Sequence, residues 1–260
     1  MTSSDAGLRT FAGLRRIVAR LRSTDGCPWD KVQTHESLRP YLLEESSEVL
    51  SALDSADPSR LQEELGDLLF QVLIHIQIAQ EQREFRLADV IESIGAKLVR
   101  RHPHVFGDAI AETPEAVVEQ WDDLKRSERG DNSALTGIPE ALPALAYAQS
   151  LQARASRAGF AFDSVDQAWQ ALEEELEELR RAETAEERTE ELGDTVFALA
   201  NLARWYEVES EDALRSTCRG FSRRFQRMEA LAAGRNLDLR SLPTEEKLAL
   251  WEEANAGANP

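Results

Sequence analysis

Residues 61–76 read Leu-Gln-Glu-Glu-Leu-Gly-Asp-Leu-Leu-Phe-Gln-Val-Leu-Ile-His-Ile. Their apolar side chains recur at the i, i+3, i+4, i+7 spacing of one helix face, which predicts a helix with a buried stripe. The pentapeptide Glu-Glu-Leu-Gly-Asp inside this stretch, at 63–67, occurs again at 190–194. Each copy follows an acidic helical segment, so the sequence indicates duplication of a helical unit.

The composition predicts an all-α protein. The chain has 260 residues, 42% of them hydrophobic, which is enough for the core of one large domain or two ordinary ones. Leu, Ala, Glu and Arg dominate, whereas Gly and Pro are sparse, and this balance favours helix. The formal net charge of −18 argues against a general binder of nucleic-acid backbones, which needs a basic surface.

The sequence also argues against a membrane partner. The most apolar run, 68–78, is interrupted by polar side chains and falls short of the roughly 20 residues that span a bilayer. Residues 1–21 carry arginines at helical spacing, which favours an ordinary amphipathic helix over a transit peptide. Cys27 and Cys218 form no CxxC pattern and are typical of cytosolic thiols, so we expect a cytoplasmic protein.

Helical periodicity and turn residues predict two copies of one bundle. In the first half, helices are expected over 34–54, from Pro58 through the apolar stripe, over 87–102 and over 112–129. In the second half, they are expected over 168–182, 186–206 and 211–233, with a frayed tail at 254–260. A cluster of Gly, Pro, Asp and Asn separates the halves. The predicted division is a domain at 1–129, a linker at 130–145 and a domain at 146–260.

Acidic side chains on two neighbouring helices of the first half predict a cation site. Residues advance about 100° each around a helix, so Glu44, Glu45 and Glu48 fall within a narrow arc. Glu64 and Asp67 lie one turn apart on the next helix, and packing of the two helices brings both sets together. Crowded carboxylates repel one another unless a cation or proton lies among them. Oxygen ligands suit a hard cation, Mg²⁺ with Mn²⁺ as a substitute, which can in turn hold phosphate oxygens.

The second half repeats this arrangement. Its corresponding carboxylates are Glu174, Glu175, Glu178, Glu191 and Asp194. The alternative is a solvated Glu-rich face, which a single EExxE motif in a chain with 48 acidic residues would favour. The repeated ExxD partner favours a functional site. So does the glycine inside each repeat, because a mid-helix glycine costs about 1 kcal/mol relative to alanine.

Basic side chains in the first half predict phosphate contacts. Lys97 and Arg101 are four residues apart on one helix face and offer a seat for phosphate oxygens, the alternative being a salt-bridged surface helix. Trp121 and Lys125 form a second ligand-facing group. A tryptophan is, however, more typical of a core than of a base-stacking platform.

These motifs, together with Gly26-Cys27-Pro28-Trp29-Asp30 and the segment Arg101-His102-Pro103-His104-Val105-Phe106, resemble those of MazG-type nucleoside triphosphate pyrophosphohydrolases over nearly the whole chain. The resemblance implies two tandem MazG-like helical-bundle domains, usually assembled as a homodimer. It implies Mg²⁺-dependent hydrolysis of an NTP or dNTP to the monophosphate and pyrophosphate, an activity compatible with cleansing of the nucleotide pool. It further implies that the acidic motifs bind metal and that Lys97 and Arg101 bind phosphate.

The second half departs from the family pattern at one position. Arg224 matches the phosphate-binding arginine, but Gly220 stands where the lysine is expected. We expect a carboxylate that the metal does not saturate, Glu45 or Glu175, to accept the proton of the attacking water. Two alternatives remain open: a helical pyrophosphatase with a narrow substrate, a dNTP or phosphoribosyl-ATP, and a non-catalytic helical scaffold that docks a basic partner. The sequence alone gives the Cys-Pro-Trp-Asp segment no physical role.

Overall fold

The structure is a computed structural model, and it describes residues 5–114, 116–118, 120–121, 124 and 133–256. The regular elements within these residues are all helices, which confirms the predicted all-α class. The chain divides into two compact units, Met1–Leu124 and Lys125–Pro260, and each is described by itself. None of the described helices is long and apolar enough to cross a bilayer.

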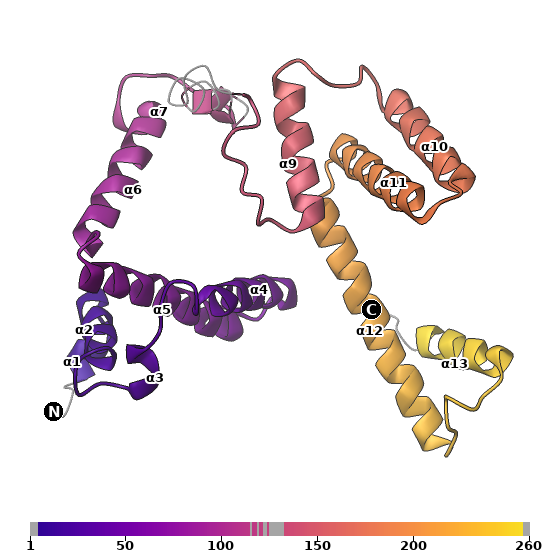
Figure 1. Cartoon of the computed structure of the whole chain (residues 1–260), viewed down its shortest axis with the longest axis horizontal. Coiled ribbons are helices and arrows are strands. Elements are labelled where there is room, and N and C mark those ends of the chain that lie inside the picture. Colours follow the sequence, from indigo (N-terminus) through magenta and orange to yellow (C-terminus); the bar gives the residue numbers. More distant parts are fainter. Residues whose placement is uncertain (1–4, 115, 119, 122–123, 125–132, 257–260) are drawn as a thin grey trace. The chain divides into compact units, whose positions relative to one another are not determined.

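The N-terminal unit is built around two long helices that lie side by side (Figure 1). Its helices are α1 Asp5–Leu8, α2 Phe11–Leu21, α3 Pro28–Lys31, α4 Arg39–Ser55, α5 Pro58–Gln82, α6 Leu87–Arg101 and α7 Pro103–Phe106. Asp57 begins α5, because its side chain accepts hydrogen bonds from the amides of Ser59 and Arg60. The second half of α5 supplies the core, where Leu73, Ile74 and Ile78 pack with Val18 and Leu38.

The start of α4 differs from the prediction. A helix was expected from residue 34, but α4 begins at Arg39. The Thr34 side chain instead accepts a hydrogen bond from the Ser37 amide, 3.2 Å away, and Ser37 Oγ accepts one from the Thr34 amide. These local bonds form a turn that competes with helix and places Leu38 in the core.

The C-terminal unit contains a second pair of acidic helices, packed against a helix that the prediction missed (Figure 1). Its helices are α9 Ala144–Arg157, α10 Val165–Arg181, α11 Ala185–Trp205, α12 Ser210–Gly234 and α13 Thr244–Ala256. Ser164 caps α10, and Thr184 with Glu187 forms a capping box at the start of α11. Ala168, Leu172 and Leu202 form the core between α10 and α11.

The predicted frayed tail at 254–260 is wrong at its start. Helix α13 continues to Ala256, and Ala254 is buried against Leu250, Met228 and Ala232. The Ala-, Gly- and Asn-rich sequence at this end suggested a frayed tail. It did not show that the small methyl group of Ala254 packs between two helices. Residues 257–260 lie outside the described residues.

Candidate functional site

Helix pairs α4–α5 and α10–α11 each bring three carboxylates together. One carboxylate oxygen from each of Glu45, Glu48 and Glu64 lies within 4.8 Å of the others. In the C-terminal unit, Glu175, Glu178 and Glu191 meet the same condition. In each trio two glutamates come from the EExxE helix and one from the ExxD helix. The helical spacing therefore converts two separate motifs into one cluster of oxygens.

The remaining predicted carboxylates lie at the edge of these clusters. Asp67 and Glu44 are exposed, and both act electrostatically on Glu45. Asp194 and Glu174 act in the same way on Glu175. Each predicted set of five therefore lies in one neighbourhood, with three members at the centre.

Crowding perturbs the acid groups at the centre of both clusters. Partial burial, reinforced by the negative charge of Asp67, raises the pKa of Glu45 above its ordinary value. Burial and Asp194 raise the pKa of Glu175 in the same way, and desolvation with Glu178 raises the pKa of Glu191. A cation bound among these carboxylates would reduce the repulsion between their negative charges, as expected of a metal-binding site.

The two clusters differ in their polar neighbours. Gln71, buried on α5, hydrogen-bonds the Glu45 side chain and thereby opposes the rise in its pKa. Gln71 lies four residues after Asp67. The residue four positions after Asp194 is Ala198, whose side chain can make no hydrogen bond. Arg60 also pairs with Glu64, its Nε lying 3.4 Å from Oε1. In the C-terminal set, Gln170 Nε2 instead donates to Glu174 Oε1 at 2.9 Å, so each cluster has an amide neighbour of its own.

Lys97 and Arg101 lie on α6, away from the acidic cluster of their own unit. Helix α6 follows the C-terminal end of α5 (Figure 1), whereas Glu64 and Asp67 lie within the first ten residues of α5. The rise of 1.5 Å per residue puts Asp67 about 22 Å from the end of α5. Because α6 leads away from α5 and does not run back along it (Figure 1), the single chain does not bring these basic residues to the carboxylates, and their phosphate role stays a prediction.

Two other predicted substrate residues also lie apart from the clusters. The Trp121 ring packs edge-on to His102, with ring centroids 5.6 Å apart. The guanidinium of Arg224 lies 4.8 Å from the centroid of the Trp251 ring, where α12 meets α13. Lys125 lies outside the described residues. The contact with Trp251 was not anticipated, because the two residues are distant in sequence and share no motif.

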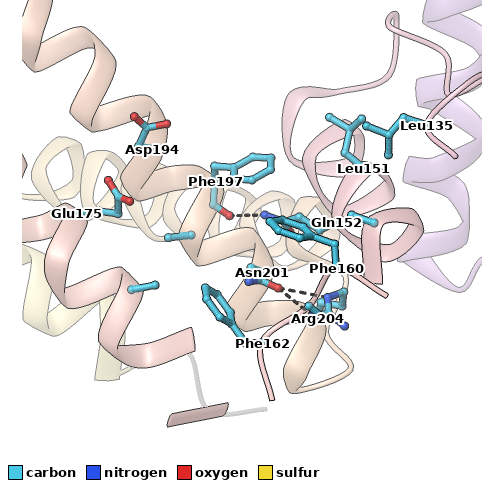
Figure 2. Close-up of a pocket in the computed structure, with 14 residues that line it drawn as sticks. Leu135, Leu151, Gln152, Phe160, Phe162, Glu175, Asp194, Phe197, Asn201 and Arg204 are labelled. Atoms are coloured by element: carbon cyan, nitrogen blue, oxygen red, sulfur yellow. Dashed lines mark hydrogen bonds between the residues drawn. The ribbon is translucent and has the colours of Figure 1, made fainter. Parts of the chain in front are cut away.

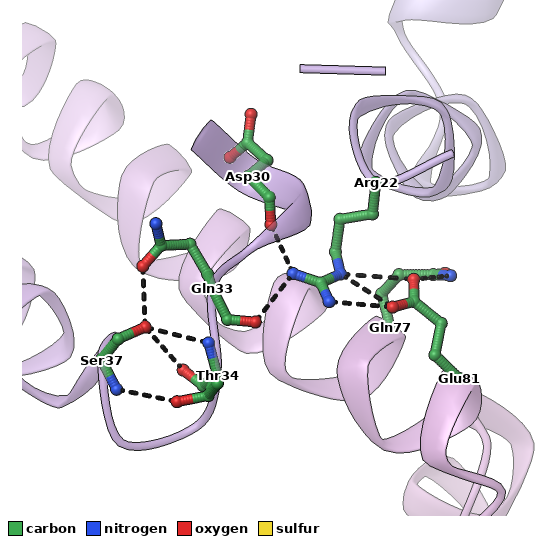
Figure 3. Close-up of polar contacts among 7 residues, drawn as sticks. All are labelled: Arg22, Asp30, Gln33, Thr34, Ser37, Gln77 and Glu81. Atoms are coloured by element: carbon green, nitrogen blue, oxygen red, sulfur yellow. Dashed lines mark hydrogen bonds and ion pairs between the residues drawn. The ribbon is translucent and has the colours of Figure 1, made fainter. Parts of the chain in front are cut away.

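Arg22 is a residue to which the sequence motifs did not point, and it holds the backbone of the Cys-Pro-Trp-Asp segment in place. Its side chain is only 6% exposed. It donates to the carbonyl oxygens of Asp30 and Gln33 at 2.5 and 3.1 Å, and it binds Glu81 of α5 (Figure 3). The segment forms α3, and Arg22 fastens α3 and the following turn to the core. An arginine in an amphipathic helix carries no sequence signal for this role.

A cavity of about 530 Å³ adjoins the C-terminal cluster and was also not foreseen (Figure 2). Glu175 and Asp194 lie at its acidic end. Its other lining includes the aromatic side chains of Phe160, Phe162 and Phe197. Phe160 and Phe162 belong to the loop between α9 and α10, which periodicity could not place.

Comparison with known proteins identifies the family. Residues 33–106 match the MazG nucleotide pyrophosphohydrolase domain. The chain is 43% identical over 255 residues to the nucleoside triphosphate pyrophosphohydrolase/pyrophosphatase MazG of Thermotoga maritima, covering 97% of this chain and 98% of that protein. It is 40% identical to the nucleoside triphosphate pyrophosphohydrolase of Escherichia coli K12, covering 92% and 95%. An uncharacterized Bacillus subtilis protein, YabN, is 41% identical over 94% of this chain and 51% of its own length. With its paired acidic helices and a near full-length match to such relatives, this chain belongs to the MazG family of nucleotide pyrophosphohydrolases.

Proposed function

We propose that this chain hydrolyses nucleoside triphosphates, NTP or dNTP, to the monophosphate and pyrophosphate in the cytoplasm. The observation that carries the proposal is the convergence of three carboxylate oxygens within 4.8 Å in each unit. The names of the relatives from T. maritima and E. coli support the same reaction. Removal of aberrant nucleotides from the cellular pool is the role that fits such an activity.

The donor set of each cluster fits Mg²⁺. Glu45, Glu48 and Glu64 offer only carboxylate oxygens, which suit a hard cation and not a soft one. Burial and then the charge of Asp67 raise the pKa of Glu45, and a divalent cation would offset that negative charge. Glu44 and Asp67 complete the N-terminal ligand set, and the corresponding five carboxylates form the C-terminal one. When bound, Mg²⁺ or its substitute Mn²⁺ would neutralise triphosphate charge and lower the pKa of a water.

The residues of the chain then position and deprotonate the nucleophile. We assign the proton-accepting role to Glu45 in the first half and Glu175 in the second, because they occupy the same motif position and the pKa of each is raised. The water oxygen bonds to one phosphorus of the bridge between the α- and β-phosphates as the P–O bond from that phosphorus to the bridging oxygen breaks. The products are the monophosphate and pyrophosphate, and the water proton passes to the glutamate.

A homodimer is part of this proposal. Helix α6 is amphipathic, yet none of its residues is buried, and Ile91, Ile94 and Leu98 are about half exposed. A second copy covering this face would bury it and offers a way for Lys97 and Arg101 to meet a carboxylate cluster. Light scattering should give twice the 29.1 kDa of one chain. The Leu98→Asp variant, which places a charge on this face, should be monomeric. The Ser93→Glu variant, with its charge on the opposite face of α6, should remain a dimer.

The deciding experiment measures pyrophosphate release across a panel of nucleotides with Mg²⁺. We expect turnover by the wild-type protein and compare Asp67→Ala with Asp194→Ala to learn which half works. The tandem arrangement, a domain at 1–129 and one at 146–260, predicts that the two variants affect separate sites. Activity confined to one dNTP or to phosphoribosyl-ATP would favour the narrow-substrate enzyme. Absence of turnover, together with binding of a basic partner, would favour a scaffold.

A further inference from the structure

The cavity beside the C-terminal cluster has the composition of a nucleoside site. Its volume of about 530 Å³ lies within the range of roughly 300–1,000 Å³ that is usual for small-molecule sites. Glu175 and Asp194 occupy one end, and phenylalanines line the walls. An aromatic wall gives a planar base a face to pack on, and it stands next to the carboxylates assigned to the cation that would hold the phosphates.

One face of α11 lines this cavity, with the carboxylate of Asp194 toward one end and the amide of Asn201 farther along the helix. Asp194, Phe197, Asn201 and Arg204 are separated by three, four and three residues, so they share a face of the helix, and all four line the cavity. At 1.5 Å per residue, Asn201 lies about 10 Å beyond Asp194 along the axis. A nucleotide whose phosphates lie at Asp194 would therefore place its base toward Asn201.

The amide of Asn201 has a fixed orientation. Its Oδ1 accepts hydrogen bonds from Arg204, with Nε at 3.3 Å and Nη2 at 3.1 Å (Figure 2). A guanidinium only donates, so the atom that faces Arg204 must be the oxygen. What Asn201 retains for a ligand is its N–H₂ group, a donor.

Gln152 supplies the opposite polarity on the neighbouring wall. The residue is only 9% exposed, and its Nε2 donates to the carbonyl oxygen of Phe197, one turn before Asn201 (Figure 2). Its Oε1 is buried and has no hydrogen-bond partner among the described residues. An acceptor left unpaired in this way is destabilising, so a ligand N–H that reached it would be favoured.

We propose that this cavity binds the base of the substrate and prefers keto bases (guanine, uracil and thymine) to amino bases (adenine and cytosine). The inference rests on the proposed function. A keto base presents a carbonyl next to a ring N–H, which complements the donor of Asn201 and the acceptor of Gln152. An amino base bound in the same orientation presents its exocyclic amine to Asn201 and its unprotonated ring nitrogen to Gln152, so donor would meet donor and acceptor would meet acceptor.

The N-terminal half lacks this amide. Asn201 lies seven residues after Asp194. The residue seven positions after Asp67 in the first half is Ile74. Ile74 is fully buried in the core of its unit with Val18. Discrimination of bases is therefore assigned to the C-terminal half alone.

The test compares binding of the α,β-imido analogues of GTP and ATP by calorimetry, in an Asp67→Ala background that weakens the N-terminal site. We expect the GTP analogue to bind at least about fivefold more tightly than the ATP analogue. Asn201→Asp replaces the N–H₂ donor by an acceptor and should bring the ratio to one or below. Asn201→Leu removes the polar group without adding charge and should bring it close to one.

The matched control is Asn255→Asp on the exposed face of α13, which adds the same charge and should leave the ratio at the value of the parent. Equal affinity for both analogues in the parent, or a ratio that neither folded Asn201 variant moves, would overturn the base pocket. Failure of the wild-type protein to release pyrophosphate from any triphosphate would overturn the proposed function instead.

Discussion

The guanidinium of Arg22 and the carboxylate of Glu81 form an ion pair, with Nη2 2.8 Å from Oε2 and Nε 3.1 Å from the same oxygen. Hydrogen bonds to a charged partner contribute about 1.5–3 kcal/mol each when they are shielded from water. Arg22→Ala also leaves two carbonyl oxygens without this donor, so we expect the free energy of unfolding to fall by about 2–3 kcal/mol. Urea denaturation would measure it.

The control for this variant is Arg20→Ala, in the last turn of α2 and two residues before Arg22. Arg20 pairs with Asp25 at 3.8 Å, and both side chains are largely exposed. Exposed pairs contribute about 0–1 kcal/mol, so the control should change little. Equal effects of the two substitutions would show that Arg22 does not fasten α3.

The contact between His35 and His75 predicts a loss of stability in mild acid. Their Nδ1 atoms are 2.7 Å apart, so one ring must donate and the other accept. Burial and the nearby His35 lower the pKa of His75 from 6.5. The folded protein thus keeps His75 neutral, whereas the unfolded chain takes up a proton as the pH falls through about 6.5. Stability is therefore lost below that pH.

His75→Phe keeps an aromatic ring at this position and removes its titration. Melting temperatures between pH 7.5 and 5.5 should fall less in the variant than in the wild type. Carboxylates titrate alike in both proteins, so the comparison isolates the histidine. Parallel curves would contradict the argument.

The acidic clusters predict stabilisation by Mg²⁺. At a concentration one hundred times its Kd, a ligand that binds only the folded state adds about 2.7 kcal/mol of stability. Glu48→Gln and Glu178→Gln should each reduce the rise in melting temperature that Mg²⁺ causes, whereas Glu92→Gln, exposed on α6, should not. Because the pKa of Glu45 is raised, protons should begin to compete with the cation above the ordinary glutamate pKa of 4.5. The rise should therefore shrink as the pH falls from 8 toward 5.

The glycine of the repeated motif predicts a conflict between stability and activity. A Cβ atom added at Gly66 would meet no described atom within 4 Å, and the same holds for Gly95 on α6. Both alanine variants should gain about 0.5–1 kcal/mol of helix stability. We expect Gly66→Ala to lose turnover despite this gain, because the open space beside Gly66 lies between the cluster residues Glu64 and Asp67. Full activity of Gly66→Ala would mean that the glycine is not required for substrate approach.

The sequence predicted the helices where periodicity and caps agree. Pro58 after Asp57 defines the start of α5, and the apolar stripe carries it onward, so both were readable from local chemistry. The convergence of Glu45 with Glu64 followed from helical spacing on two neighbouring helices. The turn before α4 was missed because Thr34 suits a helix cap and a local turn equally well.

What the sequence did not show depends on contacts between distant residues. Arg224 was readable as a motif arginine, but its packing on Trp251 depends on how α13 folds back. The cavity depends on a loop whose aromatic residues have no periodic neighbours. Its polar residues Gln152 and Asn201 lie on different helices, and they line one cavity only because α9 packs against α11.

The two-residue connection Ala56-Asp57 between α4 and α5 bears on how the chain folds. Such a short link makes the acidic hairpin a unit of local contacts, and local contacts form early. The pair should therefore assemble soon after it leaves the ribosome, while its own negative charge resists closure. A cation bound by these carboxylates would then assist folding before any nucleotide binds.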